Sequence, residues 1–120
     1  MFPRYQVRQG DVLLVPIATL PPNLTPVPED RGRVVLAYGE VTGHAHAFAG
    51  GAGVQLLTSP APVTIRESTE PVMRFLQVDR LSHLVHEEHG TVTIGDDNVG
   101  AFAVITPREY TPWGDRAVLD

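Results

Sequence analysis

The chain of 120 residues contains neither cysteine nor lysine. Without cysteine it forms no disulfides, no thiolate metal sites and no cysteine nucleophile. Without lysine it has no Schiff-base chemistry and no P-loop lysine, and arginine supplies all nine strongly basic side chains. Any reactive or metal-binding group must therefore come from histidine, the carboxylates or the hydroxyls.

Long apolar runs are also missing from the sequence. No stretch reaches the ~18 apolar residues that a membrane-spanning helix needs. The segment Met1–Tyr5 lacks the apolar region of a signal peptide, so we expect a cytoplasmic protein without a membrane segment. The net charge of −5 opposes contact with a phosphate backbone, which disfavours nucleic acid as a partner.

Short apolar runs between turn residues indicate the fold class. Eleven prolines and eleven glycines punctuate runs rich in valine, isoleucine, leucine and phenylalanine, and no window shows a helical period. We predict an all-β fold, a small single-domain β-barrel or β-sandwich of short antiparallel strands over residues 1–120, with at most one short helix. A helical turn is expected only near Asp115–Leu119. Strands are expected at 11–17, 33–39, 44–48, 54–57, 63–67, 73–79, 83–86, 91–94 and 101–106.

Two segments are predicted to be irregular. Residues 20–30 hold four prolines, which cannot donate to a ladder, so we expect an extended surface loop that serves as a connector or as a partner-binding strip. Residues 49–53 are rich in glycine and follow one expected strand and precede another, which predicts a turn.

All five histidines fall into two short segments, 44–46 and 83–89. His44 and His46 are two positions apart in an expected strand, so their side chains share a face. Two imidazoles so placed can chelate one ion. In the second segment, strand alternation puts His83 and His86 on opposite faces, while His86 and His89 could both face one ion.

The sequence therefore predicts a shared site for a divalent transition metal, such as zinc, iron or manganese, with imidazole ligands. The expected ligands are His44, His46, His86 and His89. Glu40, Glu87 and Glu88 lie close enough in sequence to act as further ligands, to orient a histidine or to move protons in catalysis. The leading hypothesis is a metal-binding protein, with an unidentified small-molecule substrate if it is an enzyme. The alternative is an assembly or adaptor module whose histidines and proline-rich loop lie at a homo-oligomer or partner interface.

Two resemblances accompany these residues. Gly39–His46 resembles part of the first cupin motif, in which a glycine precedes His-x-His on a barrel strand, and this implies a small metal-binding barrel. The glutamate of that motif is missing, because Ala47–Gly51 stands there, and Gly90 follows the second histidine segment where the second motif has a preceding glycine. Across most of its length the chain resembles a group of small uncharacterised bacterial and phage-type proteins. The shared motifs are Gly10–Val12, Gly39–His46, Leu84–His89 and Arg108–Tyr110.

Overall fold

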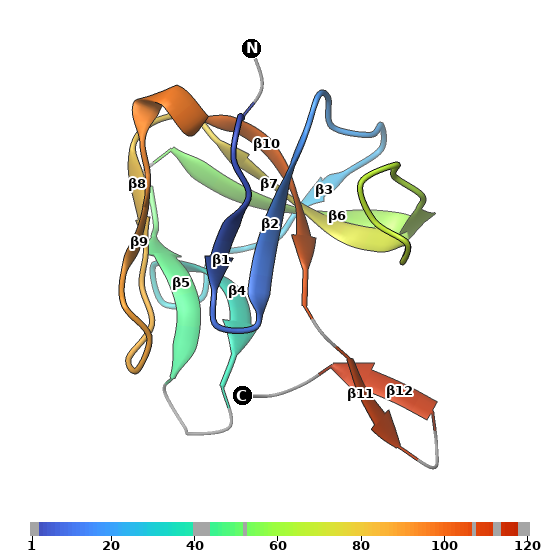
Figure 1. Ribbon diagram of the computed structural model, residues 1–120. Helices are drawn as coiled ribbons and strands as arrows, with labels where there is room; N and C mark the ends of the chain where they lie inside the picture. The colour runs from blue at the N-terminus through green and yellow to red at the C-terminus, as the bar shows by residue number, and fades with distance from the viewer. Residues whose placement is uncertain (1–2, 40–43, 52, 107, 112–113, 118–120) are drawn as a thin grey trace.

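The computed structural model describes residues 3–39, 44–51, 53–106, 108–111 and 114–117. These residues form an all-β protein of antiparallel strands with one 3₁₀ turn, η1, at Asp96–Asn98 (Figure 1). The strands are β1 Val7–Gln9, β2 Val12–Ile17, β3 Thr25–Pro26, β4 Arg33–Tyr38, β5 Ala45–Ala49, β6 Val54–Val63, β7 Val72–Val78, β8 Ser82–Leu84, β9 Val92–Ile94, β10 Gly100–Ile105, β11 Arg108–Thr111 and β12 Gly114–Ala117. The fold class predicted from the short apolar runs is confirmed.

The larger layer is a six-stranded sheet with the order β1-β2-β10-β7-β6-β3. β1 and β2 form a hairpin with a two-residue loop at Gly10 and Asp11, and Gln9 pairs with Val12 across it. At the opposite edge lies β3, the short strand within the proline-rich segment. Pro26 is tolerated there because an edge strand has no second ladder that needs its missing N–H.

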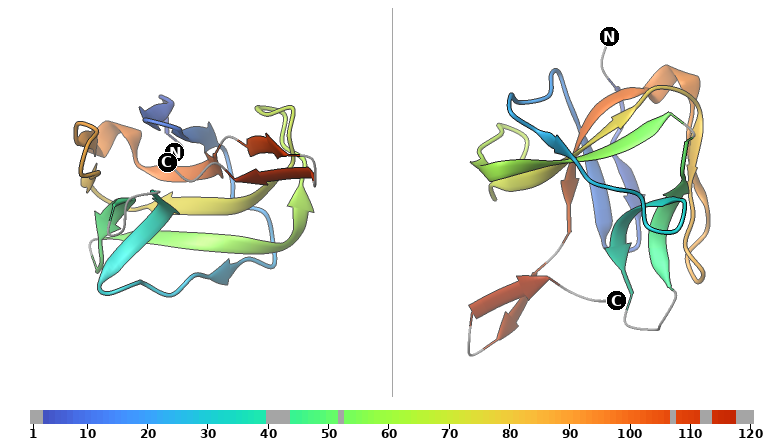
Figure 2. Two further views of the ribbon diagram at one scale, coloured as in Figure 1. Left: turned by 90° about the horizontal axis from the view of Figure 1, so that it is seen from below. Right: turned by 180° about the vertical axis from the view of Figure 1, so that it is seen from behind.

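The second layer is built from two smaller pairs, β4–β5 and β8–β9. An isolated antiparallel bridge between Ala47 and Val85 joins β5 to the segment that follows β8. Figures 1 and 2 show β5 beside the β8–β9 hairpin, to one side of β1 and β2. The bridge makes one layer of four strands.

Strand alternation divides the apolar side chains of the large sheet between two clusters. Leu14 and Phe102 are fully buried in the main core, together with Phe48 and Leu84 of the second layer. Val15 and its neighbours on the opposite face form a second cluster with residues of β6, β7 and β10. Because β5 and the end of β8 help to enclose the main core, their side chains are held in fixed positions close to it.

Several local expectations differ from the structure. The residues at 114–117 form strand β12 where a helical turn was expected, because they pair with β11. The strand expected at 63–67 is absent; residue 63 instead ends the long strand β6. In the described part of the chain no sheet closes into a barrel, so the layered alternative describes these sheets better. None of the helical segments described there has the length and apolar character that a membrane crossing requires.

Candidate metal centre

The register between β5 and the end of β8 brings the two histidine segments together. The Ala47 N–H donates to the Val85 carbonyl at 3.0 Å, and the Val85 N–H donates back to Ala47 at 2.9 Å. In an antiparallel pair with this register, residue 46 lies opposite residue 86. Two backbone hydrogen bonds thus set His46 against His86 across the strands.

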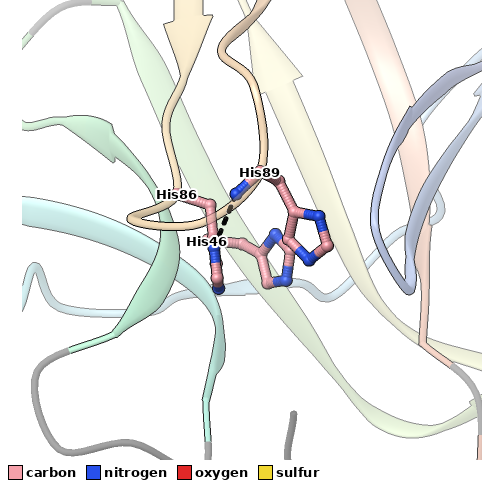
Figure 3. Close-up of side chains that lie close together, drawn as sticks. All are labelled: His46, His86 and His89. Atoms are coloured by element: carbon pink, nitrogen blue, oxygen red, sulfur yellow. Dashed lines mark hydrogen bonds between the residues drawn. The ribbon is translucent and has the colours of Figure 1, made fainter.

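Three imidazoles meet at this point, and Figure 3 shows them together. The ring centroids lie 4.3 Å apart for His46 and His86, 4.6 Å for His86 and His89, and 5.5 Å for His46 and His89. One nitrogen from each ring can be chosen so that all three lie within 4.8 Å of one another. His46 lies on β5, whereas His86 and His89 lie in the turn between β8 and β9.

Two of the three rings are shielded from solvent, and His89 is partly exposed. His46 is completely buried and His86 is 7% exposed. The Nε2 atoms of both rings are buried and have no hydrogen-bond partner among the residues that the structure describes. Burial lowers the pKa of His46 to about 4, with nearby His86 and His89 acting in the same direction and Asp11 and Glu87 opposing them. His46 is therefore a neutral imidazole at physiological pH, which is the form that binds metals.

The β1–β2 hairpin supplies a third wall of the site. The Gln9 side chain lies 2.8 Å from Nδ1 of His46 and also bonds to the Leu84 and Gly90 carbonyls. Gly10 lies directly against His89, so that a Cβ at Gly10 would meet Nε2 of that ring at 2.5 Å. Glycine thus allows the turn to approach the imidazole closely, and its φ of +55° suits a residue without a side chain.

A fourth histidine and two glutamates lie at the rim. His44 lies beside His86, with ring centroids 5.9 Å apart, and its Nδ1 is 3.6 Å from Oε2 of Glu88. Glu87 accepts a hydrogen bond from the Ala45 N–H at 2.9 Å. That bond is the main reason why the pKa of Glu87 lies below its usual range, so its carboxylate is ionised at neutral pH.

Of the remaining histidines, His83 lies away from the cluster. His83 is exposed and its Nδ1 lies 2.9 Å from the Thr93 hydroxyl, on the opposite face from the cluster, as strand alternation predicted. Glu40 lies outside the described residues. The structure therefore brings His44, His46, His86 and His89 into one neighbourhood and leaves His83 out.

Sequence reasoning missed Gln9, Gly10 and Asp11 as part of the site. The signal was present in the early Gly-Asp-Val motif, because a glycine and an aspartate directly before an apolar run favour a tight turn. What the sequence could not give was the position of this turn beside His89, which depends on packing between the two layers.

Residues 8–106 match the model of a family described as a domain of unknown function, DUF8820. The match covers most of the chain, so the protein belongs to this family. Neither a curated protein nor a solved structure matched this chain. The histidine cluster and the hairpin wall both lie within the matched residues.

Proposed function

We propose that this protein binds one divalent transition metal between His46, His86 and His89, with His44 as a neighbouring candidate ligand. The observation that carries the proposal is the convergence of three imidazoles in which two Nε2 atoms are buried without a partner. Buried polar atoms are ordinarily satisfied, and each unpaired one needs an explanation. A metal ion bound through both Nε2 atoms explains the two together.

The spacing of the nitrogens fits such an ion. A tetrahedral site with metal–nitrogen bonds of about 2.1 Å separates its ligand atoms by about 3.4 Å. The three nitrogens already lie within 4.8 Å of one another. The widest pair therefore needs to close by no more than about 1.4 Å, which small rotations of imidazole rings can provide.

The donor set favours zinc, iron or manganese. Nitrogen ligands with carboxylates at the rim, and no thiolate in the sequence, suit borderline metals. Three protein ligands with a further position open are typical of catalytic sites, where a bound ion polarises a substrate oxygen or activates water. We assign the role of proton acceptor to Glu87 and Glu88, which lie at the rim of the cluster. We also propose an unidentified small-molecule substrate, and we keep Glu40 as a candidate ligand or proton carrier.

His86 has to change its hydrogen bonds to become a ligand through Nε2. Its Nδ1 accepts bonds from the Glu88 N–H at 3.0 Å and the His89 N–H at 3.3 Å (Figure 3 draws the second). A neutral ring whose Nδ1 accepts carries its proton on Nε2. Metal binding at Nε2 moves that proton to Nδ1 and releases both backbone donors, so the turn at 87–89 should rearrange on loading.

An interface role for the whole histidine cluster has less support. His46 and His86 are buried within a single chain, and no second copy is needed to bring them together. Metal binding is for this reason the function that we place first.

Zinc retention by variants tests the proposal. Wild type, His46→Ala and His83→Ala are purified without a histidine tag, loaded with excess zinc, desalted and assayed by elemental analysis, after circular dichroism shows that each is folded. We expect one zinc ion per chain in wild type and in His83→Ala, and none in His46→Ala. Loss of all zinc from wild type would overturn the proposal, and so would equal retention by His46→Ala.

A further inference from the structure

Gln9 is a buried amide whose orientation is fixed by its neighbours. The residue is 2% exposed. Its Nε2 donates to the Leu84 carbonyl at 2.8 Å and to the Gly90 carbonyl at 3.0 Å. Carbonyl oxygens only accept hydrogen bonds, so both contacts require the NH₂ end of the amide. The Oε1 end must then face His46.

This orientation determines the tautomer of His46. The amide Oε1 lies 2.8 Å from Nδ1 of His46 and can only accept, so the neutral ring carries its proton on Nδ1. Nε2 is left with a free lone pair. Because that atom is buried and lies in the cluster with His86 and His89, the lone pair is available to a metal.

We propose that Gln9 is the positioning residue of the metal centre, holding the His46 ring in the tautomer that presents Nε2 to the ion. The inference rests on the proposed metal-binding function. Partners of this kind raise metal affinity because the ligand needs no change of tautomer or ring orientation when the ion arrives, and their loss typically costs about 10- to 100-fold in affinity.

A purely architectural role for Gln9 makes a different prediction. In that case the two bonds to Leu84 and Gly90, which tie β1 to the β8–β9 hairpin, are what matters. Two substitutions separate the roles. Gln9→Met removes all three hydrogen bonds, while Gln9→Glu removes the two donated bonds and keeps an acceptor for the Nδ1–H of His46.

The experiment measures the His46 tautomer in metal-free protein by the nitrogen chemical shifts of its ring, and then zinc affinity by competition with a chelator. We expect the proton on Nδ1 in wild type and in Gln9→Glu, and a population with the proton on Nε2 in Gln9→Met. Zinc affinity should fall by about 10- to 100-fold in Gln9→Met and by clearly less in Gln9→Glu. Gln77→Met, on β7 away from the cluster, should behave as wild type in both measurements.

Two results would overturn the positioning role. One is a wild-type His46 with its proton on Nε2, which needs no variant to be folded. The other is an equal tautomer and an equal zinc affinity in Gln9→Glu and Gln9→Met. The tautomer of His46 is measured in metal-free protein. A wild type that binds no zinc therefore refutes the metal site, and the tautomer measurement still shows whether Gln9 orients the His46 ring.

Discussion

Burial separates the histidines of this chain into different chemical roles. His46 is enclosed by the two layers and the β1–β2 hairpin, whereas His83 faces outward beside Thr93. An imidazolium is costly to bury, so enclosure keeps His46 neutral and leaves a nitrogen lone pair free. The same residue type is a candidate ligand at one position and a surface group at the other.

The lowered pKa of His46 predicts a pH-dependent stability of the metal-free protein. Its pKa falls from 6.5 to about 4 on folding, so the unfolded chain takes up the proton first as the pH drops. The contribution to stability is complete above pH 6.5 and is lost as the pH falls from there through about 4. It amounts to about 3 kcal/mol.

Denaturant unfolding between pH 7.5 and 4 measures this dependence, with chelator present. His46→Gln, which has no titrating ring at this position, should show a shallower decline than wild type. Identical pH profiles for the two proteins would show that His46 is not the buried neutral group described here.

Gly10 should be needed for the position of His89 as well as for the turn. Gly10→Ala places a methyl group where Nε2 of His89 lies, and it also strains a backbone with φ of +55°. Gly51→Ala is a matched control, because its φ is +71° and nothing lies within 4 Å of the added Cβ. Both variants should lose roughly 1–2 kcal/mol of unfolding free energy from the left-handed backbone.

Zinc competition and denaturant unfolding separate the two effects of the Gly10 substitution. Only Gly10→Ala should also lose zinc affinity, because only that substitution forces the His89 ring to move. Equal zinc affinities in Gly10→Ala and Gly51→Ala would contradict the account of the hairpin wall.

Among the elements, the junction between β5 and the end of β8 governs the site. It consists of the reciprocal hydrogen bonds of Ala47 and Val85, outside the regular ladders of either pair. A shift of one residue in this register would turn His46 or His86 to the opposite face. The cluster therefore depends on a short contact between two separate strand pairs.

Val85→Pro tests that junction with little disturbance of the core. The Val85 side chain is 48% exposed, so the main loss is the N–H that donates to Ala47. We expect a fall of about 1–3 kcal/mol in unfolding free energy and a loss of zinc affinity. Val85→Thr, which keeps the N–H and the branched side chain, should match wild type. A folded Val85→Pro that binds zinc as tightly as wild type would show that the bridge does not set the cluster.

The sequence predicted the strands better than it predicted which segments lie side by side. Alternation within single strands correctly put His44 and His46 together and turned His83 away, because the period of two is local. It could not show that β5 lies beside Val85 or that Gly10 lies against His89, since these contacts join segments about 40 and 80 residues apart and depend on sheet packing. The strands β1 and β3 were missed because β1 has a single apolar residue and β3 lies within the proline-rich segment.

For the whole molecule, the two layers and one hairpin assemble the site within a single chain. β5, the β8–β9 turn and strand β1 each contribute side chains, and the main core lies between the layers that carry them. A histidine cluster assembled in this way brings three rings close together before any ion arrives. Such preorganisation is what a selective metal site needs.

Anomalous scattering from crystals grown with zinc tests the central claim most directly. Data collected on both sides of the zinc absorption edge locate the ion without reference to the protein density. We predict a single strong peak about 2.0–2.1 Å from one nitrogen each of His46, His86 and His89. A crystal whose zinc peaks lie only at exposed groups such as His83, with none between these three rings, would contradict it.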